Sequence, residues 1–220
     1  MDNLVFILEL IGTIAFSLSG TLTGIQKKMD LLGVIILGAV TATGGGILRD
    51  ILLGTLPPKA FINGIYILVS SIVSVAVFFY IYFRIKGYRK IIHADFLPIS
   101  LIADAIGLGI FTVVGVKAVF DADMVLNYFI PVLLGTITGV GGGVFRDILA
   151  GDKPYIFVRH IYASAAIVGA LISTVLWIPC GQNIAAIVGF FTVLIIRIVA
   201  IKFNLNLPKV DLPEENKTNE

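Results

Sequence analysis

The sequence predicts an all-α integral membrane protein that crosses the bilayer seven times. Of its 220 residues, 58% are hydrophobic and only 14% are charged, and the mean hydropathy is +1.02. Soluble domains usually contain about 45–50% apolar residues. The other two observations behind this prediction are seven apolar runs of membrane-spanning length and a long motif that occurs twice.

The apolar runs are long enough to cross about 30 Å of hydrocarbon as helices. They cover 4–25, 31–53, 61–83, 96–116, 124–150, 160–177 and 183–201. The first run lacks the positive residues that open a signal peptide, so we expect it to be retained. We expect a single transmembrane domain over 1–203, followed by a disordered cytoplasmic tail over 204–220, which is polar and contains prolines.

An eleven-residue motif divides the chain into two repeats. Residues 44–54, GGGILRDILLG, return as residues 141–151, GGGVFRDILAG, after a shift of 97 residues. Glycine triplets and Arg-Asp pairs are costly in lipid, so their duplication indicates a repeated functional element. Repeat one covers about 4–83, repeat two covers about 96–177, and the helix at 183–201 stands outside both.

The first helix of each repeat matches more weakly than the motif helices. Residues 24–26, Gly-Ile-Gln, align with residues 115–117, Gly-Val-Lys, at a shift of 91. Each repeat contains three helices, so the second repeat must enter the membrane from the opposite face. We therefore expect an inverted three-plus-three arrangement with one additional helix.

Basic residues in the loops predict the orientation, because Lys and Arg collect on the cytoplasmic side of a membrane protein. One set of loops contains Lys27, Lys28, Arg84, Lys86, Arg89, Lys90, Lys153, Arg159, Lys202 and Lys209, and the other contains Lys59 and Lys117. The first set is expected in the cytoplasm of a plasma-membrane protein. The N-terminus is then outside and the C-terminus inside.

The glycine triplets predict that the second and fifth spanning helices are broken near the middle of the membrane. Glycine weakens a helix by about 1 kcal/mol per residue, and the carbonyls freed at a break need partners in a water-filled path. The candidate ion path is then lined by Gly44, Gly45, Gly46, Gly141, Gly142 and Gly143. The alternative is that the triplets only allow the helices to pack closely.

The Arg-Asp pairs, Arg49 with Asp50 and Arg146 with Asp147, lie too deep to reach water easily. Adjacent residues project about 100° apart on a helix, so crossed ion pairs are expected, Arg49 to Asp147 and Arg146 to Asp50. These pairs either act as a gate on the ion path or clamp the two repeats together.

Three further polar residues are candidates for the path. Asp104 is a buried acid that could attract a cation, although a hydrogen-bonded structural acid is an equal alternative. Ser19 belongs to a polar stripe on the first helix, and Lys117 either faces the path or extends along the helix to the interface. Arg197 of the last helix is expected at the cytoplasmic interface.

The composition also excludes several functions. The single Cys180 and the isolated His93 and His160 form no metal-ligand spacing, so no metal site is predicted. The glycine motifs lack the residues of a phosphate loop, and nothing resembles a nucleophile with its base, so no enzyme is expected. We expect no nucleic-acid or protein partner and no cofactor. Membrane lipid is the expected surrounding, and permeant potassium or sodium ions are implied by the resemblance described next.

The doubled Gly-Gly-Gly-x-x-Arg-Asp-x-Leu-x-Gly motif, with Pro57-Pro58 after the first copy and Asp152-Lys153-Pro154 after the second, resembles the prokaryotic trimeric intracellular cation (TRIC) channels. This family overlaps with bacterial membrane proteins named as putative glycine transporters (UPF0126). The resemblance implies a homotrimer with a separate hourglass-shaped pore in each protomer, bent at the glycine triplets.

Two functions follow from this resemblance. The first is a potassium-permeable monovalent cation channel, and the second is a secondary transporter of glycine or another small amino acid. Inverted repeats with broken helices are found in many transporters, so architecture alone does not separate them. The small number of carboxylates available to relay protons favours the channel.

Overall fold

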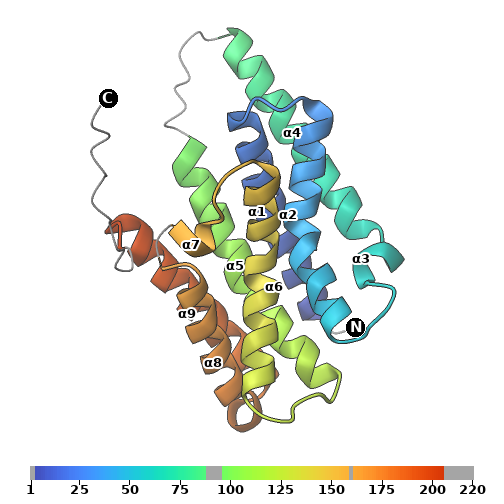
Figure 1. Ribbon diagram of the computed structural model, residues 1–220, viewed down its shortest axis with the longest axis vertical. Helices are drawn as coiled ribbons and strands as arrows, with labels where there is room; N and C mark the ends of the chain where they lie inside the picture. The colour runs from blue at the N-terminus through green and yellow to red at the C-terminus, as the bar shows by residue number, and fades with distance from the viewer. Residues whose placement is uncertain (1–2, 88–95, 159–160, 206–220) are drawn as a thin grey trace, which may run out of the picture.

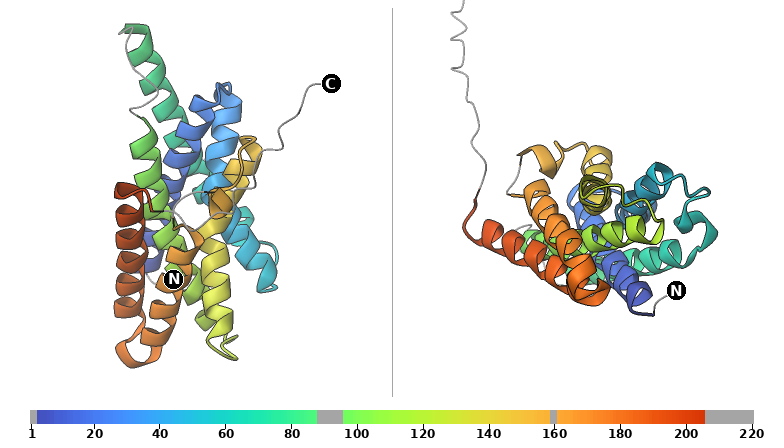
Figure 2. Two further views of the ribbon diagram at one scale, coloured as in Figure 1. Left: turned by 60° about the vertical axis from the view of Figure 1, so that its left-hand side comes forward. Right: turned by 90° about the horizontal axis from the view of Figure 1, so that it is seen from below.

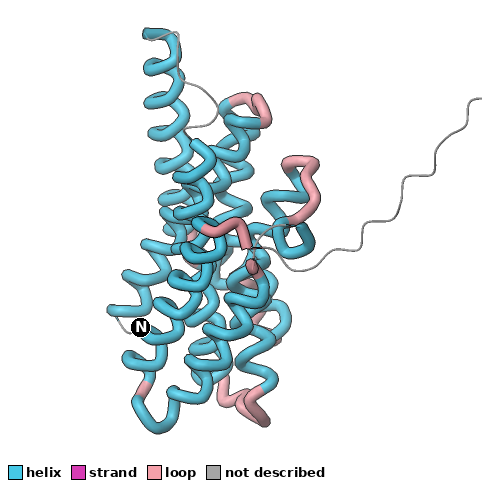
Figure 3. Tube along the Cα trace, turned by 90° about the vertical axis from the view of Figure 1, so that its left-hand side faces the viewer, coloured by secondary structure: helices cyan, strands magenta, loops and turns pink. Residues whose placement is uncertain are grey.

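The computed structural model describes residues 3–87, 96–158 and 161–205, and all regular structure in this part of the chain is helical (Figure 3). Within the described residues, seven helices have the length and apolar composition to cross a membrane, which confirms the predicted number of spans. They are α1 (Asn3–Gln26), α2 (Leu31–Leu52), α4 (Ile65–Gly87), α5 (Phe96–Asp121), α6 (Phe129–Leu149), α8 (Ala163–Cys180) and α9 (Gln182–Lys202). Two short helices, α3 (Lys59–Ile62) and α7 (Tyr155–Val158), follow α2 and α6.

Four helices, α1, α2, α5 and α6, form the centre of the bundle (Figure 1 and Figure 2). α4 covers α1 and α2 on one side, and α8 and α9 cover α5 on the other. An 18-residue stretch of α5 is 83% buried, compared with 22% for α4 and 28% for α9. The apolar faces of α4 and α9 are therefore available to lipid or to another protomer.

Small and hydroxyl-bearing residues hold α1 and α2 against α4. Ser17 Oγ donates to the Ser70 carbonyl oxygen at 2.8 Å, and Thr21 Oγ1 donates to Ser74 Oγ at 2.9 Å. A Cβ built on Gly38 would lie 2.2 Å from Ser74 Oγ. Membrane helices associate through such close contacts and interhelical hydrogen bonds, because lipid is as apolar as their side chains.

The predicted breaks at the glycine triplets are wrong, because α2 and α6 each continue through their triplet as one helix. The triplets instead allow the two helices to touch. A Cβ on Gly45 would lie 2.0 Å from the carbonyl oxygen of Thr138, and a Cβ on Gly142 would lie 2.1 Å from that of Thr41. Tight helix packing offsets the low helix propensity of glycine. We call this contact the glycine crossing.

Contacts between α1 and α5 are reciprocal in the same way. The rings of Phe16 and Phe111 stack with 5.3 Å between their centroids, while Gly12 faces the Phe111 ring and Gly107 faces the Phe16 ring. Both pairs are separated by 95 residues (111 − 16 and 107 − 12). The expected shift of 91 between these helices is therefore wrong by about one helical turn.

The reciprocal contacts are those that a two-fold relation between the repeats requires. In Figure 1, α2 runs downward and α6 runs upward, in agreement with the expected inversion. The inverted repeat and its orientation across the membrane stay predictions. Of the residues that support them, Arg89, Lys90, Arg159 and Lys209 lie outside the described part of the chain, as does most of the predicted disordered tail.

The last glycine of each motif ends its helix. Gly54 and Gly151 have φ angles of 70° and 73°, which other residues rarely adopt. The N–H of Gly54 donates to the Ile51 carbonyl, and the N–H of Thr55 donates to the Asp50 carbonyl; the second motif makes the equivalent bonds. This pair of hydrogen bonds is the Schellman motif, so the terminal glycine has a structural role.

Candidate functional site

Each Arg-Asp motif forms an ion pair between its own two residues. Arg49 Nε donates to Asp50 Oδ1 at 2.9 Å, and Arg146 Nε donates to Asp147 Oδ1 at 2.8 Å. All four side chains are buried. The predicted crossed pairs, Arg49 to Asp147 and Arg146 to Asp50, are therefore wrong, because the long arginine side chain folds back and reaches its own neighbour.

The second oxygen of each aspartate binds the loop that follows its helix. Asp50 Oδ2 accepts a hydrogen bond from the Lys59 backbone N–H, and Asp147 Oδ2 accepts one from the Tyr155 N–H, both at 2.8 Å. These N–H groups stand at the start of α3 and α7, so each aspartate satisfies a helix end that has no intrahelical acceptor. The motif thus clamps its own loop rather than the opposite repeat.

A carboxylate and a tyrosine complete the arrangement in each repeat. The Tyr66 hydroxyl donates to Glu9 Oε2, and the Tyr162 hydroxyl donates to Asp104 Oδ1 at 3.3 Å. Glu9 and Asp104 are separated by 95 residues (104 − 9), the same shift that relates Phe16 to Phe111. Burial, followed by the charge of Asp104, raises the pKa of the Tyr162 hydroxyl well above its ordinary value, so this hydroxyl stays a donor.

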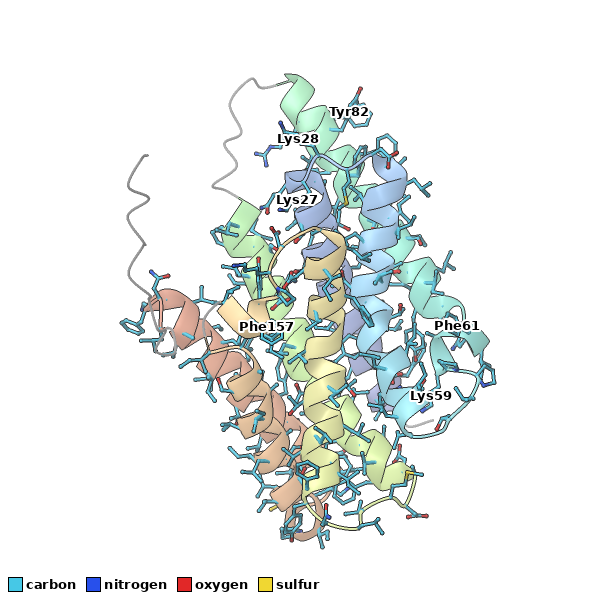
Figure 4. All side chains as sticks on the ribbon, in the orientation of Figure 1. Lys27, Lys28, Lys59, Phe61, Tyr82 and Phe157 are labelled. Carbon is cyan, nitrogen blue, oxygen red and sulfur yellow. The ribbon has the colours of Figure 1, made fainter. Side chains whose placement is uncertain are left out.

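The two repeats differ in what surrounds their carboxylate. At Glu9 lies a small open cavity with about 30 Å³ of space accessible to water. Its lining includes Glu9, Thr13, Ala42, Thr43, Gly46, Arg49, Asp50, Lys59, Ala60, Tyr66 and Phe111. A Cβ built on Gly46 would meet only Arg49 Nη2, at 3.9 Å. We call this space the Glu9 cavity; Figure 4 labels Lys59, one of its basic residues, beside α3.

The corresponding space around Asp104 is filled by charged and polar side chains. Arg146 Nη1 donates to Asp104 Oδ1 at 2.6 Å and to Ser19 Oγ at 2.7 Å. Arg197 of α9 approaches the other carboxylate oxygen, with 3.7 Å between Nη2 and Oδ2. Its guanidinium lies 4.7 Å from the centroid of the Tyr162 ring. We call this group the Asp104 cluster: Ser19, Asp104, Arg146, Asp147, Tyr162 and Arg197.

Arg197 is buried, contrary to the prediction from the sequence, and two tyrosines belong to the site although the sequence did not single them out. Arg197 was expected at the interface because it stands near the end of the last helix, but only 1% of it is exposed. Tyr66 and Tyr162 resemble ordinary interfacial aromatics in sequence. Both tyrosines can be found from the repeat. A shift of 95 residues relates Glu9 to Asp104, and a shift of 96 residues relates Tyr66 to Tyr162 (162 − 66).

The structure brings most of the predicted path residues together. The six triplet glycines lie at or beside the glycine crossing, and Ser19 and Asp104 lie in the Asp104 cluster. Lys117 does not join them. Its Nζ binds Asp121 Oδ1 at 2.8 Å and Gln182 Oε1 at 3.3 Å, close to the turn between α8 and α9.

Comparison with known proteins agrees with this duplicated structure. The family model described as "Glycine transporter" matches the chain twice, over residues 6–82 and 101–177. The UPF0126 inner membrane protein YadS of Escherichia coli is 34% identical, and the alignment covers 97% of this chain and 100% of YadS. The UPF0126 membrane protein YvgT of Bacillus subtilis is also 34% identical, over 92% of this chain and 94% of YvgT.

Solved structures share the fold over nearly the same length. A prokaryotic TRIC channel crystallised in 0.5 M KCl is 34% identical, with a TM-score of 0.84 and coverage of 94% of this chain and 100% of that one. The TRIC channel orthologue from Rhodobacter sphaeroides is 30% identical, with a TM-score of 0.81 and coverage of 93% and 100%. These matches agree with the seven-helix fold described above.

Proposed function

The chain belongs to the glycine transporter (UPF0126) family of multi-pass membrane proteins and shares its fold with TRIC channels, and we propose that it is a monovalent cation channel. The channel is permeable to potassium, acts as a homotrimer in the cell membrane, and has one pore in each protomer. Its N-terminus faces outside and its C-terminus faces the cytoplasm.

This proposal rests on three features near the glycine crossing: the Glu9 cavity, the stacked rings of Phe16 and Phe111, and the Asp104 cluster. The lining of the Glu9 cavity includes Phe111, whose ring stacks on Phe16. Phe16 lies against Gly142, 3.3 Å from the position of a Cβ there, and beyond the crossing lies the Asp104 cluster. We infer that this cavity, the stacked aromatic pair and the charged cluster mark a route through the protomer that is closed at the aromatic pair.

The carboxylates explain why cations are the preferred permeant ions. Glu9 of α1 and Asp104 of α5 are equivalent acids of the two repeats. Asp50 and Asp147 are each paired with the adjacent arginine, and Asp104 is paired with Arg146 and Arg197. A charge in the membrane interior is costly and marks an ion pathway unless it is fully paired. We infer that Glu9 offers a cation one stabilising position, and that Asp104 offers a second one when an arginine withdraws from it.

Transport of glycine, the alternative, has a specific observation in its favour. The Glu9 cavity presents both a carboxylate, Glu9, and a guanidinium, Arg49, as a zwitterion requires. The Nε and Nη2 atoms of Arg49 are already engaged by Asp50, which lowers its value as a carboxylate ligand. We therefore rank the transporter second.

Flux measurements in liposomes separate the two functions. Purified protein is reconstituted with potassium chloride inside, and potassium efflux and uptake of radiolabelled glycine are followed in parallel. A channel gives efflux that follows the potassium gradient without any requirement for glycine. Glycine accumulation driven by a proton or sodium gradient, with no potassium efflux, would favour the transporter.

A further inference from the structure

The two repeats are related by reciprocal contacts, but their carboxylates are in different surroundings, and α9 contributes to the difference. At Glu9 the space beyond Gly46 is open, whereas at the equivalent Gly143 a Cβ would lie 2.5 Å from the Tyr162 hydroxyl. The Asp104 end also receives Arg197 from α9, the helix that stands outside the repeat. The additional helix therefore adds one positive charge to one end of the route.

Building on the proposed channel function, we propose that Arg197 determines the ion selectivity of the Asp104 end of the pore and holds that end closed. Among the described residues, Asp104 forms ion pairs with Arg146 of the second repeat and with Arg197 of α9. Arg146 is already engaged by Asp147, Asp104 and Ser19, so Arg197 is the cation that can leave Asp104 with the fewest lost contacts.

Arg197 is held by few polar contacts. Its Nε, Nη1 and Nη2 atoms make no hydrogen bond to the described residues, and neither does Asp104 Oδ2. The distance of 3.7 Å between Nη2 and Oδ2 is an ion pair but exceeds a hydrogen bond. Leaving so many buried donors without partners is very costly in a membrane, so water is their expected partner.

The contact with Tyr162 shows how Arg197 is held in place. Its guanidinium lies over the Tyr162 ring, whose hydroxyl donates to Asp104. A cation over an aromatic face is weakly bound compared with a bidentate ion pair. A small movement of α9 relative to α5 would therefore withdraw the guanidinium and leave Asp104 facing the route as a cation site.

Charge counting gives the expected order of selectivity. Arg146, Arg197, Asp104 and Asp147 sum to zero charge. Arg197→Gln leaves one negative charge and Asp104→Asn leaves one positive charge, while the double variant is neutral again. The ratio of potassium to chloride permeability is expected to rise about tenfold in Arg197→Gln, to fall by about the same factor in Asp104→Asn, and to return towards the native value in the double variant.

Reversal potentials of purified channels under a potassium chloride gradient test this order. Arg197→Lys should restore the native ratio, because it keeps the charge. Lys202→Gln removes a charge from the exposed end of the same helix and should leave the ratio unchanged. A native channel that conducts with the same ratio in all four single variants and the double variant would overturn the role of Arg197, whereas a silent native protein would contradict the channel itself.

A second measurement tests Arg197 without requiring conduction. Cys180 is exposed, so it is first replaced by serine. Arg197→Cys is then treated in membranes with a charged methanethiosulfonate, with Ile198→Cys as a control on the partly exposed face of α9. Modification of position 197 but not of 198 is expected. Protection of position 197 in folded protein would show that no hydrated path reaches this residue and would overturn the inference.

Discussion

Gly45 and Gly142 bring the backbones of α2 and α6 into direct contact, each against a carbonyl oxygen of the opposite helix. The built Cβ positions lie 2.0 Å from the Thr138 oxygen and 2.1 Å from the Thr41 oxygen. These distances are too short for any side chain, so the helices would have to separate to accommodate one. The glycine crossing thus fixes the distance between the two repeats.

Gly45→Ala and Gly142→Ala should each destabilise the protein, because the new methyl group collides with backbone that cannot rotate away. The expected loss is about 1–3 kcal/mol, the range for overpacked interiors. It can be measured as a lower midpoint of thermal unfolding in detergent. Gly46→Ala is the matched control, because its Cβ meets only Arg49 Nη2 at 3.9 Å; equal destabilisation at position 46 would contradict the crossing.

Asp147→Asn should lower the stability of the protein much more than the loss of an exposed acid does. Asp147 is 2% exposed and neutralises Arg146, so removing its charge leaves a buried guanidinium incompletely paired, at a cost of about 3 kcal/mol. Asp152→Asn breaks only the exposed ion pair with Lys27 and should cost ~0.5 kcal/mol or less. Comparable unfolding midpoints for the two variants would contradict the assigned role of Asp147.

Phe16→Ala should open the constriction while lowering stability. Phe16 is 1% exposed and stacks on Phe111, so its truncation costs about 3–5 kcal/mol. If its ring closes the route, potassium flux should nevertheless increase per folded protomer. Leu37→Ala, at an equally buried position of α2 that packs near Gly24, should lower stability without raising flux. An equal rise in both variants would indicate a general leak.

Glu9→Gln should reduce potassium conductance most strongly at low salt. The substitution removes the negative charge of the Glu9 cavity but retains an acceptor for the Tyr66 hydroxyl. The effect should shrink as salt approaches about 1 M, where charges are screened over roughly 3 Å. Tyr66→Phe removes the hydrogen bond and keeps the charge, so it should change conductance less. The same loss at all salt concentrations would point to a structural effect instead.

Composition and periodicity were sufficient to predict the seven spans, because bilayer thickness fixes helix length. The duplicated motif also located the contact between α2 and α6. Local geometry could not be predicted: glycine propensity favoured a break at residues 44–46, whereas contact with α6 stabilises the continuous helix. Likewise, the direction of Cβ atoms favoured crossed ion pairs, but the length and flexibility of Arg49 and Arg146 allow each to reach its own aspartate.

The register of α1 against α5 was missed because short identities mislead within apolar helices. The resemblance of Gly24 to Gly115 placed the shift about one turn away from the true packing, in which Gly20 and Gly115 occupy equivalent positions against Thr41 and Thr138. With a shift of 91 residues, Glu9 does not align with Asp104, so their equivalence could not be recognised. Burial of Arg197 depends on which face of α9 meets α5, and sequence alone does not determine this.

In the proposed channel, each protomer conducts cations along the route from the Glu9 cavity to the Asp104 cluster. Single-channel recording of the purified protein in planar bilayers under a potassium chloride gradient tests it most directly. We predict discrete unitary currents that reverse near the potassium equilibrium potential, with or without glycine. Silent bilayers, together with gradient-driven glycine uptake by the same preparation in liposomes, would contradict the channel and support the transporter.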